Sequence, residues 1–126
     1  MPERNYAGLL QGGWRDLSYG AFRQGIAVHW LAQGGEGEPS VAILKYEAGA
    51  SVPLHRHAGL ETIFVLDGIQ SDERGNYPAG SVVLNAQGTE HSVWTEAGCA
   101  VLIQWDLPVI PAFSCILRRR RCLLPR

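Results

Sequence analysis

Long apolar runs are missing from this 126-residue chain, and none reaches the roughly 20 residues that a membrane-spanning helix needs. Its first residues, Met-Pro-Glu-Arg-Asn-Tyr, lack the basic and then apolar pattern of a secretory signal. Helical periodicity is almost absent, and no internal repeat is visible. We therefore expect a soluble cytoplasmic protein with one domain and no membrane contact.

Cysteine is scarce, and the three residues present, Cys99, Cys115 and Cys122, form no Cys-x-x-Cys pair. An odd number of cysteines without a signal peptide argues against a disulfide framework. Cys99 lies in an apolar stretch, so we expect a small buried side chain there and not a nucleophile.

Lysine is nearly absent, since only one of the 11 basic residues is a lysine. Residues 1–117 carry a net charge of −6, whereas the last nine residues contain five arginines. A basic tail could contact nucleic acid, anionic lipid or an acidic partner, but we favour a solvated terminus. Because the acidic body would repel a phosphate backbone, we expect no nucleic-acid binding.

Short strands separated by glycine-rich turns dominate the pattern. Strands are expected at 26–31, 41–46, 52–57, 61–66, 69–72, 81–86, 91–95 and 99–105. Asp67-Gly68 has the composition of a tight hairpin, and further turns are expected at 74–76 and 78–80. No segment supplies the helices of a parallel α/β sheet, so we predict an all-β sandwich or small barrel.

Metal-ligating side chains are concentrated between Gly49 and Gly68, which reads G-A-S-V-P-L-H-R-H-A-G-L-E-T-I-F-V-L-D-G. This stretch contains His55, His57 and Glu61, and His91 follows on a later segment. Imidazoles and a carboxylate suit a divalent first-row metal, and Zn, Fe, Mn, Ni and Cu are all compatible with this set. A mononuclear metal site is therefore the first functional hypothesis.

Strand geometry explains the spacing of these residues. Side chains two apart on a strand share a face, so His55 and His57 should point to one side and Arg56 to the other. Glu61 alternates with Ile63 and Val65, which predicts a metal at one end of an apolar, roomy interior. A lone histidine is more often a hydrogen-bonded core residue, and we interpret His29 in this way.

The stretch from Gly49 to Gly68 resembles the first cupin motif, G-x5-H-x-H-x3-E-x6-G, at every fixed position. The second motif, G-x5-P-x-G-x2-H-x3-N, is matched by Gly80, Gly88 and His91. It departs at Ala86, where the family usually has proline, and at Thr95, where it usually has asparagine. These departures bear on the loop shape more than on the ligand.

Finer features are similar to the ChrR-type cupins, including H-R-H-A-G-L-E-T-I-F-V-L-D-G, S-D-E-R-G-N-Y-P-A-G and E-H-S-V-W-T-E-A-G-C. The resemblance implies a double-stranded β-helix, a jelly-roll barrel with the ligands His55, His57, Glu61 and His91, and commonly a homodimer. It suggests an N-terminal segment at 1–13, a cupin domain at 14–107 and a basic extension at 108–126, for which disorder is one alternative.

Anti-sigma proteins of this type carry a separate N-terminal zinc module, built from histidine and cysteine, that binds the sigma factor. No cysteine precedes Cys99 in this sequence. We therefore expect a cupin domain standing alone and no direct inhibition of a sigma factor.

Two classes of function remain open. Four protein ligands on octahedral Fe(II), Mn(II) or Ni(II) leave two positions for substrate and water or dioxygen, which suits a dioxygenase acting on a small diketone or hydroxylated aromatic. Zn(II) with the same four ligands has a filled shell and suits a sensor or binding module for a small molecule. A metal-free isomerase or epimerase is disfavoured, because such cupins usually lack the complete ligand set.

Other polar and aromatic residues near the motifs receive no chemical role from the sequence. We expect Trp94 and Trp105 to serve core or dimer packing, although aromatic walls are also common in pockets. Three further side chains, Arg56, Glu90 and Glu73, are interpreted as surface charges or turn residues, and Asp72 is given no chemistry.

Overall fold

Strands account for nearly all the regular structure of residues 3–111, which are the residues that the computed structural model describes. The elements are η1 (Gly13–Asp16), β1 (Gly20–Arg23), β2 (Ile26–Ala32), β3 (Ser40–Tyr46), β4 (Ser51–Arg56), β5 (Glu61–Asp72), β6 (Gly75–Pro78), β7 (Val82–Asn85), β8 (Glu90–Trp94), β9 (Cys99–Trp105) and β10 (Ile110–Pro111). The only helical element in these residues is the 3-10 turn η1, and no helix there is long and apolar enough to cross a membrane. The all-β prediction is confirmed, and β1, β6 and β10 are strands that the sequence did not predict.

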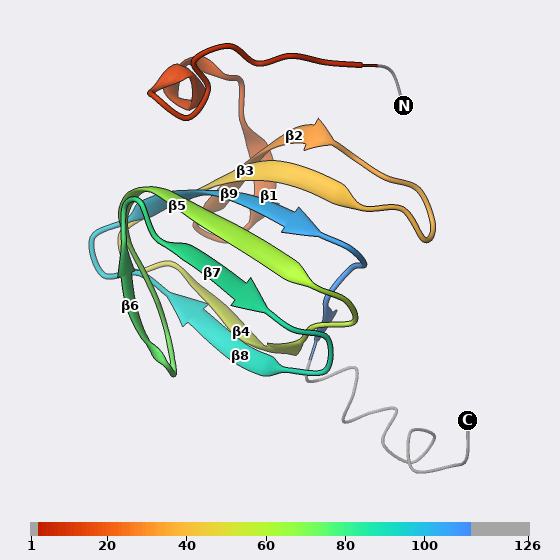
Figure 1. Ribbon diagram of the computed structural model, residues 1–126. Coiled ribbons are helices and arrows are strands. Elements are labelled where there is room, and N and C mark those ends of the chain that lie inside the picture. The colour runs from red at the N-terminus through yellow and green to blue at the C-terminus, as the bar shows by residue number, and fades with distance from the viewer. Residues whose placement is uncertain (1–2, 112–126) are drawn as a thin grey trace.

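The strands curl into two facing antiparallel layers, with β4 and β8 lying across from β3, β9 and β5 (Figure 1). Hydrogen-bonded neighbours follow the order β1-β2-β3-β9-β5-β8-β4-β10, while β6 and β7 both pair with β5. The first part of β5 pairs with β7 and β9, and its last residues pair with β6 and β8. This one strand therefore belongs to both layers and joins them.

The tight hairpin predicted at Asp67-Gly68 is wrong, because β5 continues through these residues to Asp72. The pairing of β5 with β9 shifts between Val65 and Asp67, which marks a β-bulge. Gly68 has φ +71°, and a Cβ built there would lie 2.2 Å from the carbonyl oxygen of Gly98. The glycine thus serves a close backbone approach in a bent strand, and not a chain reversal.

Two apolar clusters hold the fold together. The inner cluster fills the space between the layers and consists of Ile26, Val28, Ala42, Leu44, Tyr46, Ala50, Ile63, Val65, Val83, Val93, Cys99, Val101 and Ile103. The outer cluster lies where η1 and the segment before it cover the sheet, and consists of Leu9, Trp14, Leu31, Ile43 and Ala100. Because β3 is covered on both faces, Ala42, Ile43 and Leu44 are all buried.

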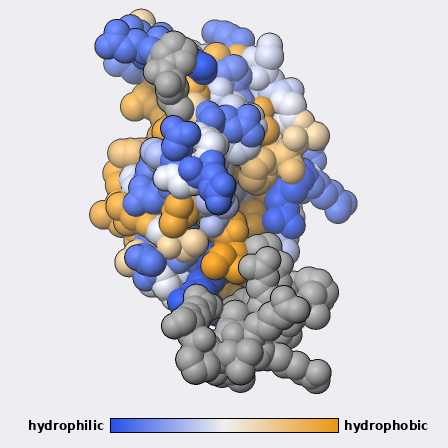
Figure 2. All heavy atoms as spheres, turned by 90° about the vertical axis from the view of Figure 1, so that its right-hand side faces the viewer, coloured by the Kyte–Doolittle hydropathy of each residue, from blue (hydrophilic) through white to orange (hydrophobic). Residues whose placement is uncertain are grey.

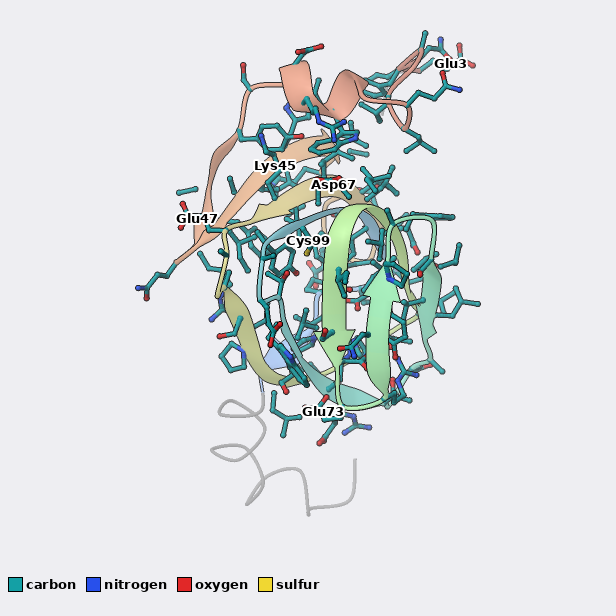
Figure 3. All side chains as sticks on the ribbon, turned by 90° about the vertical axis from the view of Figure 1, so that its left-hand side faces the viewer. Glu3, Lys45, Glu47, Asp67, Glu73 and Cys99 are labelled. Carbon is teal, nitrogen blue, oxygen red and sulfur yellow. The ribbon has the colours of Figure 1, made fainter. Side chains whose placement is uncertain are left out.

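Cys99 lies inside the molecule (Figure 3), and burial raises the pKa of its thiol to about 11. The expectation of a small buried side chain at this position is confirmed, and a raised thiol pKa is typical of a buried structural cysteine. Cys115, Cys122 and the arginine run 118–121 lie outside the described residues. The predicted extension begins with β10, whose residue Ile110 pairs with Arg56 of β4.

His29 is hydrogen-bonded as predicted, but it is not a core residue. Its Nδ1 lies 2.7 Å from the carbonyl oxygen of Ser18, and its ring meets Tyr19 edge to face. The alternation of β2 sends Val28 into the inner cluster and His29 to the outer face, where it is only partly covered. The apolar neighbours in sequence therefore gave a misleading impression of burial.

Candidate metal centre

The four predicted ligands meet at one end of the barrel, where β4 ends and where β5 and β8 begin. His55 lies on β4, His57 follows that strand, Glu61 is the first residue of β5, and His91 lies on β8 directly opposite His55 in the strand pairing. Figure 2 views the molecule from this end and shows polar and apolar side chains interspersed on its surface. The structure thus brings together every residue that the motif selects.

The ligand atoms of these side chains converge tightly. One nitrogen or oxygen from each of the four residues lies within 4.8 Å of the other three. Nε2 of His57 is 3.2 Å from Nε2 of His91 and 3.3 Å from Oε1 of Glu61. All four residues are nearly inaccessible, with 6% of His55, 1% of His57, 3% of Glu61 and 4% of His91 exposed.

Each histidine is oriented by an acceptor on its Nδ1. The carbonyl oxygen of Pro53 lies 2.9 Å from Nδ1 of His55, and that of Thr89 lies 3.0 Å from Nδ1 of His57. For His91 the acceptor is a carboxylate oxygen of Asp72 at 3.2 Å. Since carbonyl and carboxylate oxygens only accept, each Nδ1 carries the proton and each Nε2 presents a lone pair to the centre.

The carboxylate of Glu61 is also held from both sides. Asn85 Nδ2 donates to Oε1 at 3.0 Å, and the indole Nε1 of Trp105 donates to Oε2 at 2.8 Å. The amide oxygen of Asn85 in turn accepts from the guanidinium of Arg74. These donors fix the plane of the carboxylate while leaving lone pairs of Oε1 toward the histidines.

Burial governs the ionisation of the site. Desolvation lowers the pKa of His55 and of His91 below the ordinary value. Burial opposes the charge on Glu61, but the neighbouring histidines, His57 first, outweigh it, so the pKa of Glu61 lies below its usual range. Burial thus favours neutral His55 and His91, while the contact with His57 favours the ionised form of Glu61.

This arrangement fits a divalent cation. One nitrogen from each of the three histidines and a carboxylate oxygen face one another within 4.8 Å, and the lowered pKa of His55 and His91 favours the neutral imidazoles that bind metals. A metal ion satisfies all four atoms at once, and nitrogen and oxygen ligands of this kind suit first-row divalent ions. The donor chemistry of the site therefore matches the predicted cofactor class.

The departures at Ala86 and Thr95 leave the loops intact. The carbonyl oxygen of Ala86 accepts from both the backbone and the hydroxyl of Thr89, which closes the turn without a proline. That turn carries the oxygens that orient His57. Thr95 is buried. It donates to the carbonyl oxygen of Ile69 and accepts from the backbone of Gly98, so it links the loop between β8 and β9 to β5.

The sequence analysis did not assign a role in the site to three residues that the structure places there. Asp72 orients His91 and is itself held by Tyr77 and Arg74, so its assignment as a residue without a chemical role is wrong. Trp105 does more than pack, because its indole binds Glu61. Asn85 was not singled out, although its alternation with Val83 on β7 is a signal of burial.

Trp94 lies on the surface away from the ligands, and Glu90 is exposed as expected.

A small cavity of about 100 Å³ adjoins the centre and includes His55, Glu61 and His91 in its wall. Most of its other lining side chains are apolar, as predicted, but the expectation of a roomy pocket is wrong. Aliphatic side chains fill the space between the layers, which leaves only this volume. The space beside the four ligand side chains is therefore small.

A family model described as the ChrR Cupin-like domain matches residues 12–106. The chain belongs to the ChrR Cupin-like family. The anti-sigma-E factor ChrR of Cereibacter sphaeroides is 37% identical to it over 112 residues, which cover 86% of this chain and 49% of that protein. The chain thus spans about half the length of this curated relative.

Solved cupin-like structures have the same fold. A chain in the crystal structure of Rhodobacter sphaeroides SigE in complex with the anti-sigma ChrR matches with a TM-score of 0.63 and 30% identity, covering 72% of this chain and 49% of that chain. An acetylacetone dioxygenase from Acinetobacter johnsonii matches with a TM-score of 0.67 and 22% identity, covering 72% of this chain and 69% of that chain. The double-stranded β-helix that the resemblance implied is therefore confirmed.

Proposed function

We propose that His55, His57, Glu61 and His91 bind one divalent metal ion. The observation that carries this proposal is the convergence of three imidazole nitrogens and a carboxylate oxygen within 4.8 Å, on side chains that are each oriented by a hydrogen bond on the side away from the centre. Ligands oriented in this way need little reorganisation to accept the ion.

We further propose that the metal acts on a small molecule in the adjoining cavity, in chemistry of the dioxygenase type. Bound iron, manganese or nickel would supply Lewis-acid and oxygen-activating chemistry there. An apolar cavity of about 150 Å³ holds benzene, so a cavity of about 100 Å³ suits a compact diketone better than a hydroxylated aromatic. The protein contributes orientation of the ligands and exclusion of water from a buried site.

Oxygen consumption tests the enzymatic proposal. Protein loaded with Fe(II) should consume dioxygen with at least one member of a panel that includes acetylacetone, catechol and their smaller analogues. The same protein with His57→Ala should give the background rate, because the metal is not retained. Flat oxygen-electrode traces across the panel, with iron shown to be bound, would contradict the enzymatic proposal.

The second candidate is a zinc-containing sensor or regulatory module. It is favoured by the 37% identity to an anti-sigma factor, although the chain spans only about half of that protein. In this case zinc would complete a four-ligand shell and stabilise the barrel. Zinc removal should then lower the melting temperature sharply, since a ligand that binds only the folded state stabilises it. An unchanged melting temperature after chelation would argue against this candidate.

The expected homodimer stays a prediction under both candidates.

A further inference from the structure

The cavity beside the metal ligands contains a second polar group that the metal centre does not use. Tyr46 on β3 and Gln70 on β5 both line this cavity together with His55, Glu61 and His91. Both side chains are buried, with 7% of Tyr46 and 3% of Gln70 exposed. Buried hydroxyl and amide groups ordinarily find hydrogen-bond partners, so their positions in an apolar wall call for an explanation.

The two side chains contact each other but keep unused capacity. Nε2 of Gln70 lies 3.5 Å from the hydroxyl oxygen of Tyr46, and within residues 3–111 this long contact is the only hydrogen bond of the Gln70 side chain. Because the amide donates in this contact, the Tyr46 O–H remains free to donate and Oε1 of Gln70 remains free to accept. Burial also raises the pKa of Tyr46, which keeps its proton in place.

We propose that Tyr46 and Gln70 anchor a hydroxyl group of a small ligand whose other end binds the metal. A hydroxyl group accepts from Tyr46 and donates to Gln70 at the same time, which a carbonyl, an ether or a methyl group does not do. The inference rests on the proposed metal centre, and it assigns the two residues as the specificity determinants of that site.

The remaining wall restricts the body of the ligand. Between the metal ligands and the anchor, the lining consists mainly of aliphatic side chains, namely Leu44, Val52, Ile63, Val93 and Ile103. The volume of about 100 Å³ limits the ligand to a molecule smaller than benzene, which occupies a cavity of about 150 Å³. The class is therefore a compact molecule with an apolar body, a metal-binding oxygen at one end and a hydroxyl at the other.

Access to the cavity lies past two aromatic side chains. Phe22 and Trp105 line this cavity and also a more open apolar pocket of about 210 Å³, whose wall includes Trp30 and Leu107. The rings of Phe22 and Trp105 stack at 6.2 Å between centroids, and Phe22 is exposed. A ligand with an apolar body therefore has an apolar route of entry.

Two pairs of hydroxamic acids test the anchor, because the hydroxamate head binds Ni(II), which four protein ligands leave with two open positions, and each pair differs only by a methyl or a hydroxyl at the other end. The pairs are propanehydroxamic acid with hydroxyacetohydroxamic acid, and butanehydroxamic acid with 3-hydroxypropanehydroxamic acid. Each is titrated calorimetrically into nickel-loaded protein whose metal content has been measured. We expect the hydroxyl member of at least one pair to bind about tenfold or more tightly than its methyl partner, because a buried polar site discriminates against an analogue that leaves it unpaired.

Tyr46→Phe and Gln70→Met should each reduce this preference to less than about twofold. Gln33→Met, which makes the same substitution as Gln70→Met at an exposed position, should leave the preference for the hydroxyl compound unchanged. Equal binding within both pairs by the wild-type protein, or no binding of either hydroxyl compound, would overturn the anchor. A preference that survives in Tyr46→Phe and Gln70→Met would overturn it as well. Failure to load nickel refutes the metal centre instead, so the two failures are distinguishable.

Discussion

At the scale of single residues, the centre depends on the groups that hold the ligands as much as on the ligands. Pro53, Thr89 and Asp72 fix the three imidazole tautomers through Nδ1. Asn85 and Trp105 fix the carboxylate. Outer partners of this kind set ligand orientation and basicity, so the affinity for the metal should respond to their removal.

Trp105→Phe isolates one of these contacts. The substitution keeps an aromatic ring but removes the N–H that donates to Oε2 of Glu61 at 2.8 Å. We expect metal affinity to fall by about tenfold or more, measured by competition with a chromogenic chelator. Trp94→Phe is the matched control, since 38% of Trp94 is exposed away from the ligands. Equal affinities in the two variants would refute the role assigned to the indole.

The ligands themselves could be predicted from the sequence, whereas their supports could not. His55 and His57 are two residues apart, which predicts that they share one face of a strand, and the motif adds Glu61 and His91. Asp72 reaches His91 only because β5 bends and returns beside β8. Trp105 reaches Glu61 only through the pairing of β9 with the start of β5. Contacts between distant strands depend on register, which sequence periodicity does not fix.

At the scale of elements, β5 connects the two layers and carries a side chain of the metal centre at each of its ends. Its first residue is the ligand Glu61, and its last residue, Asp72, orients His91. The bulge between Val65 and Asp67 and the close approach at Gly68 let one strand change partners between these two points. Correct bending of β5 is therefore a condition for assembling the centre.

Gly68→Ala tests this dependence. The new Cβ would meet the carbonyl oxygen of Gly98 at 2.2 Å and the Cα of Cys99 at 2.9 Å, so the backbone must move. We expect a loss of about 3 kcal/mol or more in the free energy of unfolding by urea. Gly80→Ala is the control, because Gly80 also has a positive φ but nothing lies within 4 Å of its Cβ position. That change should cost about 1–2 kcal/mol, and equal costs would contradict the account of the bulge.

The regular strands were predictable because they combine β-branched residues with alternating burial. In β5 the alternation of Glu61, Ile63 and Val65 toward the interior is present as predicted. The turn at Asp67-Gly68 was mistaken because a glycine at positive φ is common to hairpins and bulges. β1 and β6 contain no buried residue and lack the alternation of apolar and polar residues that marks a strand, so their strand structure comes only from pairing with β2 and β5.

At the scale of the whole molecule, the barrel buries a cluster of ionisable side chains, and the stability of the folded state depends on their protonation. Desolvation lowers the pKa of His55 and His91, so the folded state binds protons there less readily than the unfolded chain. Stability from these groups is complete above the unfolded value of about 6.5 and is lost as the pH falls below it. Metal release adds to this effect, because protons compete for the same nitrogens.

The melting temperature should accordingly be steady between about pH 7 and 8 and should fall as the pH is lowered from about 6.5 to 5. Metal-loaded protein should show the steeper fall and should converge with metal-free protein at the acidic end. Differential scanning calorimetry at several pH values measures both curves. A melting temperature that rises or stays level on acidification would contradict the buried neutral state of these histidines.

Metal content is the measurement that tests the central claim most directly. Protein purified without an affinity tag is analysed by elemental mass spectrometry beside His57→Ala and the control His29→Ala, whose histidine lies on the outer face of β2. We predict about one divalent ion per chain in the wild-type protein and in His29→Ala. In His57→Ala we predict loss of the ion, because one of four ligands is gone. Wild-type protein without a transition metal, even after loading, or equal metal content in His57→Ala, would contradict the account.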